Sequence, residues 1–200
     1  GAMCLNMHDT QAHTAVSIHK ERRLWYAREA LRYIPHLLGL VDRNRLSATY
    51  GCFDRNFWHY KTADFPSGMC QEFVLPLALA YQHNFPGNRF YRQERLKELA
   101  TAGMHFAARS SHADGSCDDY YPFEKALGAV VFSLYAMTES YIVLGLADAA
   151  LVDFFKQRAR WLLTHNESGK LSNHHALAVV ALRNVFTITE DEAYAAAART

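Results

Sequence analysis

The chain has 200 residues, of which half are hydrophobic and a fifth are charged, so its composition is that of a globular domain rather than a disordered or fibrous chain. The formal net charge is +1 and no long Lys/Arg run is present, which argues against a nucleic-acid surface. Because no apolar stretch reaches about 18 residues and no signal-peptide pattern is present, we expect no membrane contact. The expected location is cytoplasmic, or periplasmic if a signal has been removed.

The first part of the chain combines a polar arm with one helix. Gly1-Ala2-Met3 is typical of residues left by tag cleavage, and we expect residues 1–18 to form a loose arm. From His19 to Leu38, apolar residues recur at helical spacing opposite a basic face, which predicts an outward-lying amphipathic helix. The long aromatic stretch from Tyr50 to about Ser67 has no periodic pattern, and connections of this length are often functional.

Three repeats follow, each an apolar helix and then an amphipathic one. The apolar helices are predicted to begin at Cys70, Phe123 and Asn173. This spacing of about 50 residues is typical of a helical-hairpin repeat. An apolar helix must be covered on all sides whereas an amphipathic one lies outside, so the alternation predicts an inner helix layer within an outer layer. Residues 19–200 are therefore expected to form an all-α domain, a partial α/α toroid that is truncated at its C-terminus. The amphipathic helices of the first two repeats are predicted over Arg92–Arg109 and Asp148–His165.

The loops before the inner helices are the candidate binding region. If the inner helices run parallel, these loops gather at one end of the ring. Aromatic rings stack on the apolar faces of sugars and cations bind carboxylates, so the loops suit a sugar chain with acidic groups. The alternative for each aromatic residue is packing at a helix end. The candidate substrate-binding residues are Arg55, Trp58, His59, Lys61, Asp118, Asp119, Tyr120 and Tyr121.

Two of these residues have a second interpretation. Paired carboxylates act as general acid and base in glycoside hydrolysis. Asp118 and Asp119 point apart in an extended loop, so one of them would act with Asp64, Glu72 or Glu124.

Metal and thiol chemistry receive little support. A metal site from His112, Asp114, Asp118 and Asp119 has a spacing that matches no calcium loop, and we expect neither a metal nor a cofactor. The commoner role of Asp-Gly and Asp-Asp sequences is turn formation and charge at a helix N-terminus. The four cysteines are scattered without zinc-finger spacing and are expected to be reduced thiols.

The most informative stretch is the polar cluster Lys170–Leu177, which runs into the third apolar helix. Ser172 is the predicted N-cap, which would put Asn173 and His174 in the first turn, where free N–H groups and the helix dipole favour anions. An amide beside an imidazole suits stabilising a carboxylate that takes on enolate character. The simpler alternative is that Asn173 caps the helix and His174 is solvated.

Apolar inner helices with this period, aromatic loops and an Asn-His pair that opens an inner helix together resemble the N-terminal toroid of heparinase II/III-like polysaccharide lyases and their alginate lyase relatives. In that family a β-sandwich domain follows the toroid. The resemblance implies that Asn173 and His174 neutralise a uronate carboxylate while a Tyr, as acid and sometimes also as base, promotes β-elimination. The family's Tyr and second His have no counterpart in these 200 residues, so we expect little or no turnover by this chain alone.

Two other classes stay open. A six-hairpin glycoside hydrolase would use a carboxylate pair rather than Asn-His. A non-catalytic helical repeat would bind a partner protein through an exposed apolar face. An incomplete ring leaves such a face, which would allow self-association.

Overall fold

The computed structural model describes residues 6–166, 169 and 171–199. Within these residues the regular elements are all helices, so the predicted all-α class is confirmed. None of the described helices is both long and apolar enough to cross a membrane. The tag residues Gly1-Ala2-Met3, together with Cys4, Leu5, Glu167, Ser168, Lys170 and Thr200, lie outside the described residues.

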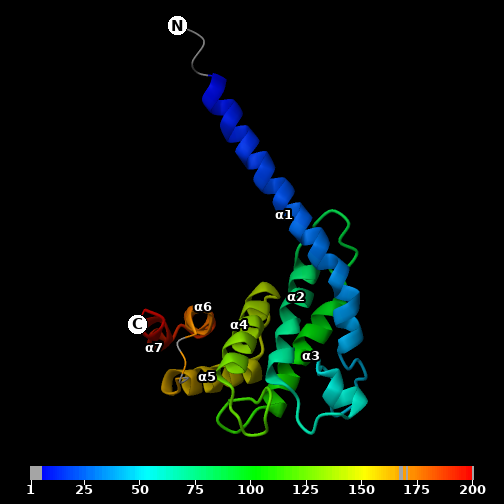
Figure 1. Cartoon of the computed structure of the whole chain (residues 1–200), viewed down its shortest axis with the longest axis vertical. Helices are drawn as coiled ribbons and strands as arrows, with labels where there is room; N and C mark the ends of the chain where they lie inside the picture. Colours follow the sequence, from blue (N-terminus) through cyan, green and yellow to red (C-terminus); the bar gives the residue numbers. More distant parts are fainter. Residues whose placement is uncertain (1–5, 167–168, 170, 200) are drawn as a thin grey trace.

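Helix α1 (Asn6–Leu40) is much longer than the predicted helix. Residues 6–18, which we expected to be a loose arm, are helical instead. Neither Gly nor Pro occurs from Asn6 until Pro35, so the sequence holds no strong helix breaker in this stretch. The C-terminal part of α1 is anchored in the core through Ile34 and Leu37. Figure 1 shows the N-terminal part projecting away from the rest of the molecule.

Three hairpins follow α1, close to the predicted boundaries. They are α2 (Val74–Gln82) with α3 (Glu94–Ser110), α4 (Leu127–Val143) with α5 (Ala149–Thr164), and α6 (Ser172–Thr189) with α7 (Glu192–Ala197). Helix α4 packs on both α2 and α6, while α3, α5 and α7 pack on α2, α4 and α6 respectively. This order is that of an inner and an outer layer. Closure of the layers into a toroid stays a prediction.

Helix α6 differs from the other two inner helices. Its fully buried residues are Ala181, Leu182 and Val185, whereas Val179 and Val180 are 41% and 42% exposed. Figure 1 shows α2 and α4 nearly upright and α6 nearly end on, so the third inner helix is not parallel to the others. The expected full coverage of α6 is therefore not found. The physical reason is that α6 packs mainly on α4, α5 and the short α7, which leaves one face open within the described chain.

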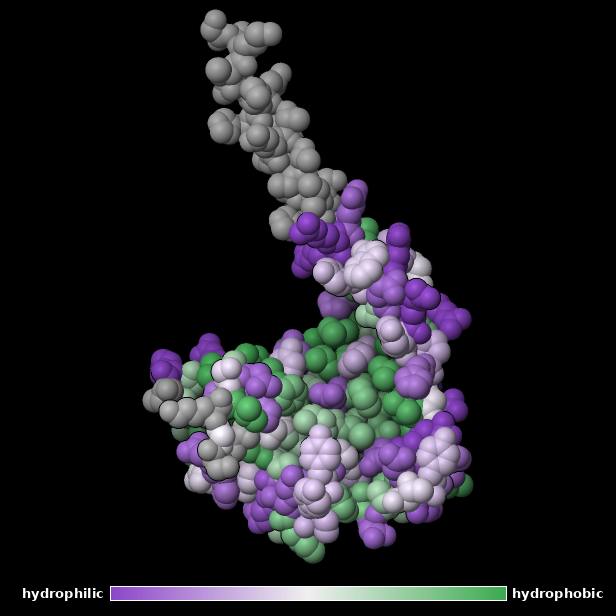
Figure 2. All heavy atoms as spheres, in the orientation of Figure 1, coloured by the Kyte–Doolittle hydropathy of each residue, from purple (hydrophilic) through white to green (hydrophobic). Residues whose placement is uncertain are grey.

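An apolar hollow lies between α1 and α6. Figure 2 shows hydrophobic side chains facing the viewer there, over the region of α2 and α4. Exposed apolar side chains occur on all three inner helices, including Leu79 on α2 and Ile142 on α4. An exposed apolar face of this kind is what a partial ring would leave.

Candidate functional site

The loops before α2 and α4 meet at one end of the molecule. The backbone N–H of Gly68 donates to the carbonyl of Asp118 at 2.7 Å, and the Ser67 hydroxyl donates to Asp119 Oδ1 at 2.5 Å. A Cβ on Gly68 would lie 2.3 Å from Cys117 Sγ, so the two loops approach too closely for a side chain at position 68. Two of the three loops that were predicted to converge are therefore in contact, and the third, Glu167 to Asn173, lies partly outside the described residues. We call residues 54–72 and 112–125 the rim.

Asp118 holds the second rim loop together from within. Its buried carboxylate accepts hydrogen bonds from His112 Nε2 and from the backbone N–H groups of Phe123 and Lys125, at 2.8, 2.8 and 3.0 Å. Burial acts to raise the pKa of Asp118, but these hydrogen bonds outweigh it, so the pKa lies below its ordinary value. Phe123 and Lys125 both have left-handed backbone angles, with φ of 62° and 52°. Such residues each cost about 1 kcal/mol or more, and Asp118 stabilises both.

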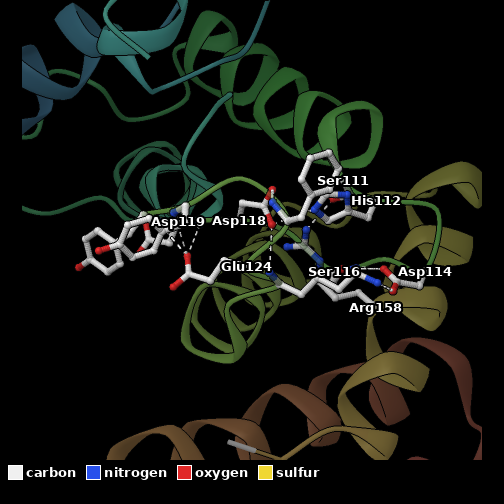
Figure 3. A network of polar contacts seen from close by, with 12 residues as sticks. Ser111, His112, Asp114, Ser116, Asp118, Asp119, Glu124 and Arg158 are labelled. Atoms are coloured by element: carbon white, nitrogen blue, oxygen red, sulfur yellow. Dashed lines mark hydrogen bonds and ion pairs between the residues drawn. The ribbon is translucent and has the colours of Figure 1, made fainter. Parts of the chain in front are cut away.

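Glu124 fixes the other half of the same loop. Its Oε2 atom accepts from the backbone N–H groups of Asp119, Tyr120 and Tyr121, at 3.2, 2.9 and 3.3 Å. Figure 3 shows Asp118, Asp119 and Glu124 within this network. Two carboxylates thus bind five consecutive or nearly consecutive backbone donors, which makes the loop rigid. Turn formation was the alternative role given for Asp118, and its contacts fit that alternative. The role of Glu124 was not predicted.

A buried arginine attaches this loop to α4 and α5. The Arg158 guanidinium donates to the carbonyl of Gly115 and to the hydroxyls of Ser133 and Ser111, at 2.9, 2.6 and 2.7 Å. Figure 3 shows Arg158 among these partners. Burial lowers the pKa of Arg158, which is only 1% exposed. The loop is therefore anchored from below as well as braced within.

The rigid loop displays aromatic rings. Tyr120, Tyr121 and Phe123 are 77%, 70% and 81% exposed. Large apolar rings gathered on a surface mark binding sites more often than chance packing. We call these three residues the aromatic platform. The predicted residues Tyr120 and Tyr121 belong to it, whereas Phe123 was not predicted.

Glu72 and Asp119 are rim carboxyl groups close enough for their charges to interact. Asp119 accepts one hydrogen bond, from Ser67, while no donor within the described residues reaches the half-buried Glu72 carboxylate. Burial and the nearby charge of Asp119 raise the pKa of Glu72. Asp119 and Glu72 are thus two carboxyl groups with different environments, which is the usual arrangement of an acid and a base.

The four candidates from the first rim loop lie around η1 (Asn56–Tyr60), a short π-helical turn. The Trp58 ring N–H donates to the carbonyl of Leu40 at 2.7 Å, and Arg55 donates to the carbonyl of Gly39 at 3.2 Å. These two side chains tie the loop to the end of α1. His59 and Lys61 are exposed and available to a ligand.

The rim as a whole is acidic. It carries seven Asp and Glu residues against three Lys and Arg residues. One of the cations, Lys125, is bound to Asp114 at 2.6 Å. The other two cations of the rim are Arg55 and Lys61, and an acidic ligand would meet more carboxylates than cations there.

The Asn-His pair lies beside the rim, against the same helix. Leu171, not the predicted Ser172, is the N-cap of α6, because the helix begins one residue earlier than expected, and no side chain caps it. Asn173 is exposed. His174 is half-buried, with its ring edge-on to Phe132 at a centroid distance of 5.6 Å.

Helix α4 is the shared contact between the rim and the start of α6. A Cβ on Gly128 would lie 2.9 Å from His174 Cε1, so the imidazole covers the first turn of α4. The N–H of Ala126, just before that turn, donates to the carbonyl of Cys117 in the rim at 2.9 Å. The rim and the Asn-His pair are thus both attached to the N-terminal end of α4.

Metal and redox sites are not formed by the residues that the structure describes. No three His, Cys, Asp or Glu side chains in these ranges gather closely enough to hold a metal ion, so the alternative of His112, Asp114, Asp118 and Asp119 is not supported. Cys52, Cys70 and Cys117 are free thiols, as expected. Burial raises the pKa of Cys52 to about 12 and that of Cys70 to about 11, so neither is an activated nucleophile.

Comparison with known proteins gives no match to a protein-family model, to a characterised protein or to a solved structure.

Proposed function

We propose that this chain is the helical part of a carbohydrate-active enzyme, of the heparinase II/III-like polysaccharide lyase type, which acts on an acidic, uronate-containing polysaccharide. The observation that carries the proposal is the attachment of two features to one end of α4: the rigid aromatic platform and the first turn of α6 with Asn173 and His174. A sugar chain lying across this end would stack on Tyr120 or Tyr121 and bring a carboxylate toward Asn173.

The chemistry assigned to α6 is charge neutralisation. The Asn173 amide and the N–H groups at the start of a helix are donors suited to a carboxylate. Taking charge off the uronate carboxylate acidifies the neighbouring C–H bond, which a base then deprotonates in β-elimination. Since the base and acid of the related family have no counterpart here, this chain supplies binding and neutralisation rather than the whole reaction.

A glycoside hydrolase is the second candidate because of one specific observation. Burial and the charge of Asp119 raise the pKa of Glu72, and two carboxyl groups in unequal environments are what glycoside hydrolysis uses. The acidic rim favours this candidate over a polyanion lyase, whereas Asn173 and His174 favour the lyase.

Calorimetric titration with a uronate hexasaccharide and with a neutral hexasaccharide tests the proposal. Loss of one stacking ring, in Tyr120→Ala or Tyr121→Ala, should weaken both interactions about threefold to tenfold. Asn173→Ala should weaken only the uronate interaction. Tyr33→Ala is the matched control, because Tyr33 is 65% exposed on α1, outside the rim.

Product analysis separates the two enzyme classes. On the lyase proposal this chain alone forms little or no unsaturated uronate, whereas a hydrolase forms new reducing ends. If the chain binds both sugars equally, Asn173→Ala is silent and Glu72→Gln abolishes release of reducing ends, the lyase proposal is wrong and the hydrolase is correct.

A further inference from the structure

A second concave site lies away from the rim, between α1 and the turn that joins α2 to α3. It is a groove of about 660 Å³, within the size range of small-molecule sites. Arg28 and Arg32 line it from α1, one helical turn apart, and Arg89 lines it from the turn. Its apolar lining residues are Leu31, Pro35, Pro86 and Phe90. The rim precedes α2 whereas this turn follows it, so the two sites lie at opposite ends of the α2–α3 hairpin (Figure 1).

The arginines of the groove are not neutralised by strong ion pairs within the described residues. Within the described residues, neither Arg28 nor Arg89 has a carboxylate at ion-pair distance. Arg32 is paired with Glu29 at 3.3 Å, but both side chains are exposed, and such pairs contribute little. The Arg89 guanidinium lies over the Phe90 ring at 5.1 Å, which orients it at the edge of the groove. Figure 2 shows hydrophilic side chains gathered on this part of α1.

We infer that this groove binds an acidic segment of a polysaccharide through its carboxylate or sulfate groups. Planar guanidinium groups bind such anions through paired hydrogen bonds, and the Pro and Phe side chains offer an apolar surface to the sugar rings. The rim has an excess of carboxylates, whereas the groove has three arginines against one carboxylate, so the groove is the more positive of the two surfaces. The choice of a sugar as ligand rests on the proposed function, whereas the choice of an anion rests on the groove itself. The groove then anchors the polymer while another segment reaches the rim.

Charge variants of the groove test this site directly. In calorimetric titration with the uronate hexasaccharide at low salt, Arg28→Gln and Arg89→Gln should each weaken binding about threefold to tenfold. Glu29→Gln should tighten it about twofold to fivefold, because it removes a carboxylate and releases Arg32. Arg43→Gln is the control, since Arg43 is exposed, carries the same charge and does not line the groove. Circular dichroism melts of these surface variants verify that they fold.

The outcomes are distinguishable from those of the rim. If both arginine variants bind like the wild type, or if Glu29→Gln binds no more tightly, the groove is not the anion site and the inference is overturned. If the arginine variants lose affinity while Asn173→Ala does not, the inference stands and the lyase proposal fails. If Asn173→Ala alone loses affinity, the lyase proposal stands and the inference fails.

Discussion

Replacing Asp118 with Asn is the sharpest perturbation of the rim, because it changes one buried oxygen to an N–H₂ group without changing the shape. Asp118 Oδ1 accepts from His112 and from the N–H of Lys125, while Oδ2 accepts from the N–H of Phe123. Whichever way the amide is turned, at least one partly buried backbone N–H then faces another donor. The variant should therefore lose stability rather than simply lose a charge.

The expected loss of stability follows from the one backbone donor that is left without an acceptor. A buried donor without an acceptor costs about 1–3 kcal/mol, so we expect Asp118→Asn to lower the free energy of unfolding by about 2 kcal/mol at neutral pH. For a chain of this length, that corresponds to a fall in Tm of roughly 4–8 °C. The pKa of Asp118 is lowered in the folded state, so its contribution is present above the ordinary value of 3.8 and is lost as the pH falls through the folded value. The difference between the variant and the wild type should shrink accordingly in acid.

Thermal and urea unfolding at pH 7 measure this effect. Asp153→Asn is the matched control, because it makes the same chemical change at an exposed residue of α5, outside the rim. The reasoning is refuted if Asp118→Asn is no less stable than Asp153→Asn.

Three further variants address separate features. Glu72→Gln should raise Tm at pH 7 and have no effect below pH 4.5, since the raised pKa of Glu72 means that its ionisation disfavours the folded state; equal Tm values at pH 7 would contradict this. Arg158→Met should lower the free energy of unfolding by about 3 kcal/mol, because the carbonyl of Gly115 and two hydroxyls lose their hydrogen-bond donor. A free energy of unfolding in urea equal to that of the wild type would contradict this. Gly128→Ala should push His174 from α4 and weaken uronate binding, while stability changes by less than about 1 kcal/mol; unchanged titrations would rule this out.

The helical periodicity predicted the fold well where burial alone decides structure. The boundaries of α3, α4 and α5 followed from apolar spacing and from Asp148, whose carboxylate caps α5 by accepting from the N–H of Leu151 at 3.2 Å. The N-terminal part of α1 was not predicted, because its polar sequence has no apolar stripe even though nothing in it stops a helix. The exposure of α6 was not predicted either, since an apolar sequence does not say which neighbour covers it.

The candidate site was predicted in part. The contact between the loops before α2 and α4 followed from the repeat, and Tyr120 and Tyr121 are exposed as expected. The roles of the acidic residues were not readable, because Asp118 and Glu124 act on backbone N–H groups that only the folded loop brings to them. Trp58 was predicted as a sugar-binding ring, but its ring N–H is bound to the end of α1, a contact between segments that the sequence pattern does not connect.

The most direct test of the account is the observation of nuclear Overhauser effects between a bound uronate hexasaccharide and this chain. The account predicts contacts from sugar ring protons to the rings of Tyr120 or Tyr121, together with contacts from a uronate residue to Asn173 or His174. Sugar contacts that involve neither the aromatic platform nor the start of α6 would contradict it.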